Sequence, residues 1–494
     1  MRGARSHPAG TLGMALRGAP EIYTDSPDLF ALSVTSRSSC APEGRSNWRW
    51  GLAFSGPRVY GSLSVAASSD AQKGGTRVNF SPRWFSKYAL ATLVVIFSGA
   101  AFAQSPGKID ISKMNPTGLL TDQYSYMVQP YNFYYFHHMD DLGFRTDVVG
   151  KSDHIYLLKD PTGSFSTNYR FGSKDYTLEN YLLKNDVTGF LVLHDNQVVF
   201  EKYLHGADRG SRFVSQSVAK SILSILVGVA VDEGKIKSVD DPVVKYLPYV
   251  LESGYRDVTI KQALQMAATV DYSEEYRDPK SGAALIGAAL ITGKPSFEDF
   301  VSSIKPSKTR PGTAFEYQSV NSQLLGLLLE RVTGEPLNRW AEDKLWKKLG
   351  AERDAFFYES KNQPNTCAFA CFNATLRDYG RVGLMMMNKG ALGGIHIVSE
   401  SWVHDSTTPD AAYLMPKPPG ADGNAAIGYA YQWWIPYGNE GVFMAMGIFG
   451  QMIYVNPARH IVIVQTSAWP EAVASSLEAE AVAVMGTIAG QVSP

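Results

Sequence analysis

Cysteine is scarce in this sequence and neither sign of charge is in excess, and both absences narrow what the chain can be. Three cysteines among 494 residues exclude a disulfide-built scaffold and a large structural zinc array. Lys and Arg number 46 against 47 Asp and Glu, which gives no electrostatic case for nucleic acid or an anionic lipid surface as the main partner. Hydrophobic residues make up 45% of the chain, ample for a packed core. The composition leaves a soluble enzyme or a large binding protein, with a small molecule as the expected partner.

Two hydrolase motifs are missing as well. No G-x-S-x-G occurs, which excludes the nucleophile elbow of α/β-hydrolases, and no H-E-x-x-H zinc motif occurs. His137 and His138, with Asp140 and Asp141 close behind, lack the H-x-H-x-D-H spacing of a metallohydrolase. Surface or packing histidines explain them better, so we expect neither a metal nor an organic cofactor.

Residues 78–103 have the three parts of a secretory signal peptide. Arg83 and Lys87 precede a short apolar stretch, residues 88–97, and Ala101-Phe102-Ala103 ends the segment. The apolar stretch is shorter than the ~20 residues of a transmembrane helix, so stable membrane insertion is not expected. An uncleaved membrane anchor is the alternative. The mature protein is therefore expected to be periplasmic or secreted and to span residues 104–494.

The segment before this signal is harder to interpret. Residues 1–77 are rich in Gly, Ser, Ala and Arg and show no sustained apolar periodicity. We interpret them as a disordered leader or as an artefact of the assigned start, with Val78 as the true first residue.

The mature chain alternates strand and helix patterns. Residues 189–203 are typical of a β-hairpin, and residues 215–234 of a helix that is apolar almost all round and therefore buried. Helical patterns dominate from about 240 to 394, residues 447–467 read as two strands, and residues 471–490 as a closing helix. Strands at both ends with helices between them predict an α/β layer interrupted by a helical insertion over about 240–394.

The pattern S-x-x-K occurs three times, at Ser105, Ser217 and Ser302, and one copy stands out. Ser217-Val-Ala-Lys220 opens the buried helix, and a spacing of three puts both side chains on one face. A serine at a helix N-terminus lies at the positive end of the dipole, which favours negative charge on an attacked carbonyl. A buried lysine tends to lose its proton and can then act as a base. The alternative is a capping serine with a lysine that reaches to solvent.

Two further segments fit the same chemistry. Tyr317, two residues before Ser319, could hydrogen-bond both Ser217 and Lys220 and pass a proton to a leaving group. Residues 447–451 lead a strand with two glycines, which let substrate approach the backbone. Their N–H groups could complete an oxyanion hole with the N–H of Ser217.

In the order S-x-x-K, Y-x-S and a glycine-containing strand motif, the chain resembles the serine β-lactamase-like superfamily. The resemblance is closest to the nylon-oligomer (6-aminohexanoate-dimer) hydrolase branch, beside the related carboxylesterases, and covers nearly all of residues 130–490. Supporting stretches include Ser273-Glu-Glu-Tyr276, Asn373-Ala-Thr-Leu-Arg-Asp378 and Gly428-Tyr-Ala-Tyr-Gln-Trp-Trp434. It implies an antiparallel sheet flanked by helices, with an inserted helical domain.

The resemblance also implies roles for single residues. Ser217 is the expected nucleophile that forms an acyl-enzyme, and Lys220 and Tyr317 are the acid/base pair. Tyr276 is the mobile tyrosine that contacts substrate, and the N–H of Gln451, after Gly450, is the second oxyanion donor. Trp433 and Trp434 either wall the cleft or are core aromatics.

Departures from the β-lactamase pattern bear on the substrate. Ser319 stands where β-lactamases have asparagine, and Phe449-Gly450-Gln451 stands where they have a lysine-containing motif. No cation replaces that lysine in this segment, and an apolar Phe449 should disfavour penicillins. Small amides or esters therefore fit better, which predicts a serine hydrolase. The alternatives are a β-lactamase-type carboxylesterase and a non-catalytic binding or sensor domain on the same fold.

One cysteine pair lies in the mature chain. Cys367 and Cys371 are four residues apart, and in an oxidising compartment they can form a disulfide if the segment is a turn. Two unpaired buried thiols are the alternative.

Overall fold

The computed structural model describes residues 113–492 apart from 124, 162, 419–426 and 439, together with the backbone of four strands between residues 31 and 78. The chain divides into two units, Met1–Phe97 and Ser98–Pro494. In the first unit, β1 (Ala31–Cys40) pairs with β2 (Ser46–Ser55), and β3 (Leu63–Ser64) with β4 (Arg77–Val78). These pairs fall in the segment interpreted above as a leader. The predicted signal peptide lies outside the described residues, apart from Val78.

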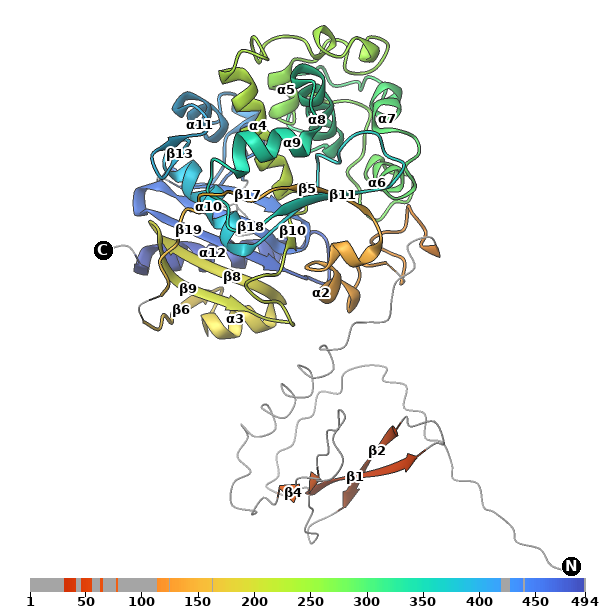
Figure 1. Cartoon of the computed structure of the whole chain (residues 1–494), viewed down its shortest axis with the longest axis vertical. Helices are drawn as coiled ribbons and strands as arrows, with labels where there is room; N and C mark the ends of the chain where they lie inside the picture. Colours follow the sequence, from red (N-terminus) through yellow and green to blue (C-terminus); the bar gives the residue numbers. More distant parts are fainter. Residues whose placement is uncertain are drawn as a thin grey trace, which may run out of the picture. The chain divides into compact units, whose positions relative to one another are not determined.

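A seven-stranded antiparallel sheet forms the centre of the second unit (Figure 1). Its order is β15 (Gly428–Tyr429), β16 (Trp434–Ile435), β17 (Phe443–Gly447), β18 (Gln451–Asn456), β19 (Ile461–Ser467), β8 (Val187–His194) and β9 (Gln197–Tyr203). The predicted hairpin and the predicted pair of C-terminal strands are both in this sheet. β18 and β19 are buried along their whole length, because helices cover both faces of the sheet.

Side chains of β8 identify which helices cover which face. Helix α10 (Leu376–Met387) packs so closely that a Cβ on Gly380 would meet Leu191 and Leu193. Tyr181 of α3 (Leu178–Lys184) packs instead against Phe190. Because successive side chains of a strand point to opposite faces, α10 and α3 lie on opposite sides of the sheet. The predicted closing helix is α12 (Ser475–Val492), which packs on β19 and on β6 (Asn168–Phe171).

The helical block is shorter than the sequence predicts. Its helices are α5 (Ile260–Leu264), α6 (Gly282–Thr292), α7 (Phe297–Ser303), α8 (Ser319–Thr333), α9 (Leu337–Ala341) and a π-helix, Glu342–Trp346. Two strands follow inside the predicted range 240–394, β11 (Ala355–Glu359) and β12 (Phe372–Ala374). They join β5 (Arg145–Val149) and β10 (Phe213–Val214) in a second antiparallel sheet. Short apolar runs do not distinguish strand from buried helix, which is why this sheet was not predicted.

The remaining elements are short and peripheral, apart from one central helix. Beside the short 3₁₀ turns, they are α2 (Tyr131–Tyr135), β7 (Lys174–Thr177), β13 (Ala391–Leu392), β14 (Ile395–His396) and α11 (Glu400–Thr407). Helix α4 (Val218–Asp232) is the predicted all-apolar helix, and all but its last two residues are buried. It follows β10 and packs against α8 and against β17 (Figure 1). The start of α4 therefore lies between the sheet and the helical block.

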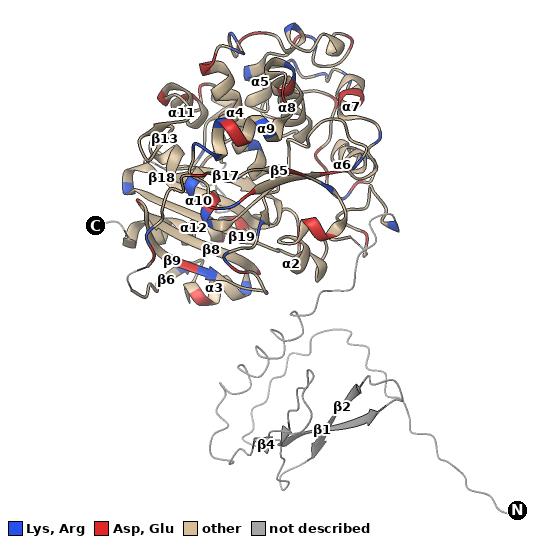
Figure 2. Cartoon of the chain, in the orientation of Figure 1, with Lys and Arg blue, Asp and Glu red and all other residues tan. Residues whose placement is uncertain are grey.

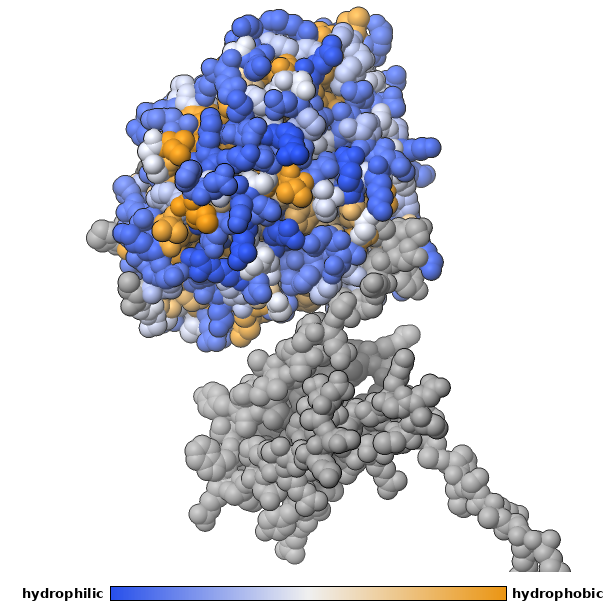
Figure 3. Space-filling model, viewed as in Figure 1, coloured by the Kyte–Doolittle hydropathy of each residue, from blue (hydrophilic) through white to orange (hydrophobic). Residues whose placement is uncertain are grey.

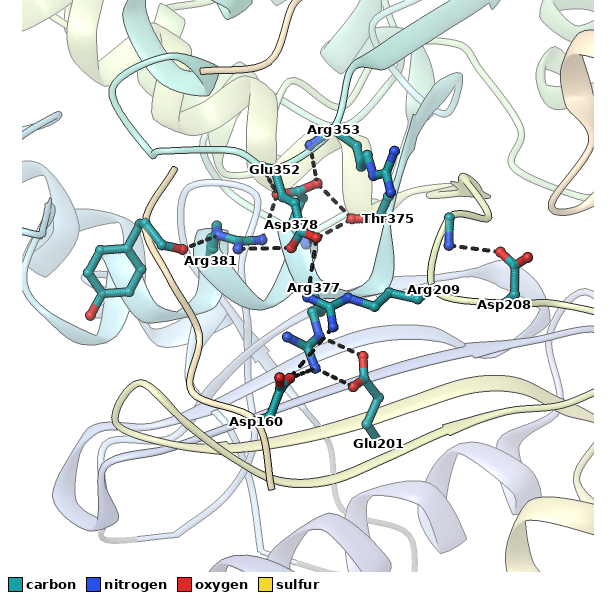
Figure 4. Close-up of polar contacts among 12 residues, drawn as sticks. Asp160, Glu201, Asp208, Arg209, Glu352, Arg353, Thr375, Arg377, Asp378 and Arg381 are labelled. Carbon is teal, nitrogen blue, oxygen red and sulfur yellow. Dashed lines mark hydrogen bonds and ion pairs between the residues drawn. The ribbon is translucent and has the colours of Figure 1, made fainter. Parts of the chain in front are cut away.

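An arginine network fixes the start of α10 to the two sheets (Figure 4). Arg377 donates to Glu201 of β9 at 2.6 and 2.8 Å and to Asp160 at 2.7 Å. Arg381 donates to Asp378 at 2.8 Å, and both of these side chains are fully buried. Thr375 caps the N-terminus of α10, since its hydroxyl accepts from the backbone N–H of Asp378.

Charged residues of both signs are scattered over the described fold (Figure 2). The face drawn in Figure 3 is mostly hydrophilic, with small apolar areas between the polar ones. Within residues 113–492, as far as they are described, no helix has both the length and the apolar character needed to cross a bilayer.

Candidate active site

Ser217 lies at the point where β10 turns into α4. Gln216, just before it, has φ +45°, a left-handed conformation that is strained for a residue with a side chain. Ser217 occupies the N-cap position of α4, but its hydroxyl makes no capping hydrogen bond to the helix. This argues against a purely structural capping serine, because the hydroxyl is left available for other partners.

Lys220, one turn into α4, points its amine at that hydroxyl. Nζ donates to Ser217 Oγ at 2.8 Å and to the backbone carbonyl of Phe369 at 2.7 Å. The residue is 1% exposed, so the alternative of a lysine reaching to solvent is excluded. Burial lowers the pKa of Lys220 from 10.5 to about 8, while the negative charge of Glu274 acts in the opposite direction. The neutral amine is therefore the minor form near physiological pH, but it is far more populated there than for an ordinary lysine.

Tyr317, just before α8, completes the group. Its ring centroid lies 5.3 Å from Lys220 Nζ, and the ring stacks on Trp434 at 5.4 Å. Burial and the charge of Glu274 raise the pKa of Tyr317, and a hydrogen bond with Ser217 opposes that rise. The phenol therefore stays protonated and lies beside the Ser217 hydroxyl.

Glu274 is a polar centre that the sequence reasoning missed. It accepts hydrogen bonds from the backbone N–H and the hydroxyl of Ser319, at 2.8 and 2.6 Å, and from the hydroxyl of Tyr276 at 2.8 Å. Its charge also acts on Lys220 and Tyr317. The available signal was an acidic residue two positions before the predicted substrate tyrosine. Its partner Ser319 is 45 residues away, a distance that sequence patterns do not bridge.

A pocket of about 670 Å³ opens over these residues. Its polar wall includes Ser217, Glu274, Tyr276 and Ser319, and Glu274 is the one charged side chain among the described residues that line it. The apolar wall comes from Phe369, from Ile448, from α6 and from the segment before α2; the last two supply Leu119, Leu120, Met127, Ile286 and Leu290. The sequence reasoning assigned no role to the segment before α2.

The turn between β17 and β18 differs from expectation. Phe449, expected above to disfavour penicillins, has φ +62° and packs inward on Phe136, so its ring does not line the pocket; Ile448 lines the pocket instead. Gly450 and Gln451 do not line the pocket either: the side chain of Gln451 is buried and donates to the carbonyls of Ser467 and Phe449. In this turn, it is the backbone at Gly447 that lies close to Ser217: a Cβ added to Gly447 would be 2.9 Å from Ser217 N.

Trp433 and Trp434 have different surroundings in the structure. Trp433 is fully buried against Phe443, as a core aromatic. Trp434 is partly buried and backs Tyr317 from outside the pocket lining. Of the predicted substrate-binding residues, only Tyr276 and Ser319 therefore line the pocket with Ser217.

The cysteine question is resolved by the loop between β11 and β12. Residues 368–370 form a turn, and Cys367 and Cys371 are joined in a disulfide with their Cα atoms 5.8 Å apart. Phe369, whose carbonyl accepts from Lys220, is the middle residue of the closed loop.

Of the two adjacent histidines, His137 packs in the core and His138 is half-buried beside it. His137 is buried among Tyr134, His138 and Phe213, and burial, helped by His138, lowers its pKa to about 4. In the part of the chain that the structure describes, no cluster of three or more His, Cys, Asp or Glu side chains is arranged to hold a metal ion.

A serine paired with a buried lysine and a protonated tyrosine, at the mouth of an apolar pocket, defines a serine hydrolase site on a β-lactamase-like fold. Comparison with known proteins agrees. Residues 185–483 match the beta-lactamase family, and the chain belongs to that family. It is 31% identical over 300 residues to the 6-aminohexanoate-dimer hydrolase of Paenarthrobacter ureafaciens. The aligned region covers 60% of this chain and 76% of that enzyme.

Two further proteins are similar to the chain. A solved Bacillus anthracis structure, provisionally named a 6-aminohexanoate-dimer hydrolase, superposes with a TM-score of 0.66 at 24% identity, over 74% of this chain and 96% of that one; this likeness shows the fold. A protein of Escherichia coli K12, provisionally named a D-alanyl-D-alanine carboxypeptidase, is 27% identical over 208 residues, 38% of this chain and 47% of that protein. The chain is thus a β-lactamase-fold serine hydrolase related to 6-aminohexanoate-dimer hydrolase.

Proposed function

We propose that the enzyme hydrolyses small linear amides of the 6-aminohexanoate-dimer type through an acyl-enzyme on Ser217. The observation that carries the proposal is the contact of 2.8 Å between Lys220 Nζ and Ser217 Oγ, in a lysine whose pKa burial lowers to about 8. The neutral amine accepts the proton of the Ser217 hydroxyl as Oγ attacks the substrate carbonyl carbon. The nucleophile and its base are already within hydrogen-bond reach of each other.

The oxyanion formed by this attack needs two N–H donors. The N–H of Ser217, at the N-terminus of α4, is the first. For the second we propose Ile448 in place of Gln451, because Ile448 lines the pocket and follows Gly447, the residue whose backbone lies against Ser217 N. Gln451 pairs with Gly447 across the turn and does not line the pocket.

Collapse of the intermediate needs an acid for the leaving nitrogen. Tyr317 fits, because burial raises its pKa and its phenol hydrogen-bonds Ser217. The phenol gives its proton to the nitrogen as the C–N bond breaks, and it regains one from Lys220. Water then attacks the acyl-enzyme ester, with the same pair handling the proton in reverse, and Ser217 is released.

Pocket chemistry supports an apolar methylene chain beside Glu274, with the carboxylate end of the dimer directed away from that side chain. Glu274 is the charged side chain of the described lining, and a carboxylate placed beside it would be repelled. Aliphatic side chains of α6 and of the segment before α2 fit methylene groups. The relative that is 31% identical carries the name of an amide hydrolase, which favours amides over esters.

The test compares two members of the same motif. Ser217→Ala should lose at least a thousandfold in kcat for the 6-aminohexanoate dimer and should fail to label with a fluorophosphonate. Ser302→Ala, in the third S-x-x-K copy, is the matched control and should behave as wild type, because the Ser302 hydroxyl donates to the carbonyl of Glu298 outside the pocket. Full activity in Ser217→Ala would end the acyl-enzyme proposal. Faster turnover of a nitrophenyl ester than of the dimer would favour the carboxylesterase alternative.

A further inference from the structure

The base of the proposed reaction receives a second hydrogen bond from outside its own helix. Lys220 Nζ donates to the carbonyl of Phe369 at 2.7 Å, and Phe369 is the middle residue of the loop closed by the Cys367–Cys371 disulfide. Both cysteines are fully buried. A covalent link thus spans the one turn that carries the acceptor for the base.

That acceptor decides where the lone pair of the amine points. A neutral lysine amine has two N–H bonds and one lone pair, and only the lone pair can take the proton of Ser217. With one N–H directed to the Phe369 carbonyl, the remaining positions of Nζ are turned toward Ser217 Oγ. A carbonyl displaced by an ångström would leave the amine free to rotate away.

We propose that the Cys367–Cys371 disulfide is a positioning element for the general base, acting through the Phe369 carbonyl. This rests on the proposed function, in which Lys220 is that base. Hydrogen bonds hold the loop to the rest of the fold on either side of Phe369. Ala368 N–H donates to Gln323 of α8 at 2.9 Å, and the carbonyl of Cys371 accepts from the backbone N–H of Tyr358 at 3.1 Å. The disulfide joins the two anchored sides, which holds the turn between them in one conformation.

The same turn keeps water from the amine. The Phe369 ring centroid lies 5.8 Å from Lys220 Nζ, and the ring packs edge-on against Phe297 of α7. Lys220 is 1% exposed, and burial is the cause of its lowered pKa. A turn released at Cys367 and Cys371 would admit water and return the pKa of Lys220 toward its ordinary value.

The test is the double variant Cys367→Ala/Cys371→Ala, compared with the wild-type enzyme. The double variant should still label at Ser217, but its kcat/KM should fall roughly tenfold or more, as expected for a misplaced base. The rising limb of its pH profile should move to higher pH by about one unit, because water reaches Nζ. A disulfide that only stabilised the fold would leave that limb in place.

Reduction of the wild type gives a second readout that does not depend on folding of the variant. Dithiothreitol gives two electrons and two protons to the cystine, which becomes two thiols, and is itself oxidised to its cyclic disulfide. Alkylation and mass measurement give the reduced fraction, and activity should fall in proportion to it, whereas the folded double variant should not respond to dithiothreitol. If circular dichroism shows the double variant unfolded, the reduced wild type decides.

Two outcomes overturn different statements. Wild-type kcat/KM and an unmoved pH profile, in the double variant or in fully reduced enzyme, would overturn the positioning role while Ser217 still labels. Absence of Ser217 labelling in the wild type itself would overturn the proposed function instead.

Discussion

At the scale of single residues, the chemistry depends on the balance between burial and one negative charge. Lys220 has its pKa lowered to about 8 by burial, and Glu274 opposes the change. The same carboxylate holds Ser319 and Tyr276 by hydrogen bonds. Glu274 thus acts through its charge on Lys220 and Tyr317, and through hydrogen bonds on Ser319 and Tyr276, the two pocket residues predicted to contact substrate.

This balance predicts a pH dependence with a definite sign. Below about pH 8, Lys220 is mostly protonated and cannot accept the proton of Ser217. The kcat/KM for a neutral ester should therefore rise with pH, and the midpoint of the rise should lie near pH 8. Glu274→Gln removes the charge that raises the pKa of Lys220, so the midpoint should move to lower pH. Stopped-assay rates across a pH series measure it.

The neighbouring carboxylate supplies the control for that experiment. Glu275→Gln changes an exposed side chain one residue along and should leave the midpoint where it is. A midpoint that stays in place in Glu274→Gln, or that moves upward, would show that Glu274 does not act on the base.

At the scale of elements, α10 is held by buried ions as well as by apolar packing (Figure 4). Asp378 accepts from Arg381 and from the backbone N–H groups of Glu352 and Arg353, at 2.8, 2.8 and 3.2 Å. Asp378 and Arg381 are both fully buried, so neither can be satisfied by water if the other is removed. The turn before β11 and the start of α10 are therefore joined through one carboxylate.

Asp378→Ala should lower the free energy of unfolding by about 3–5 kcal/mol, because it removes the fully buried carboxylate that pairs with Arg381 and accepts from two backbone N–H groups, and leaves Arg381 only Glu352 at 3.2 Å and the carbonyl of Tyr156. Urea unfolding followed by circular dichroism measures the loss. Arg209→Ala is the comparison within the same network: Arg209 is about half exposed and pairs with Glu352 at 3.2 Å, so its removal should cost about 0–1 kcal/mol. Equal costs for the two variants would contradict the view that burial sets the energy of this network.

Sequence patterns predicted the features that involve residues close together in the chain. Ser217 and Lys220 are three residues apart on one apolar helix, and both the helix and the pair could be read from spacing alone. Glu274 and Phe369 could not, because each meets the site through a contact with a residue distant in sequence. The residues of the turn after β17 could not be placed from the sequence for a different reason. The positive φ of Phe449 turns its ring inward, and alternation along a strand does not foresee such a residue.

At the scale of the whole molecule, the question is how much of the 494 residues the enzyme needs. The family match begins at residue 185, yet Leu119, Leu120 and Met127 already line the pocket. The functional chain therefore begins well before the matched region. We propose that the protein is exported and starts at Gln104, and the disulfide fits an oxidising compartment.

The protein isolated from its natural host should then carry Gln104 as its first residue, outside the cytoplasm, and show the full activity of the enzyme. N-terminal peptide mass and kcat/KM on cell fractions measure both. A recombinant chain that starts at Gln104 should match it, whereas one that starts at Gln129 should lose activity because three apolar side chains of the pocket wall are gone. Peptides from residues 1–77 in the isolated protein would contradict the proposed start, and full activity in the shorter chain would show that this wall does not contact substrate.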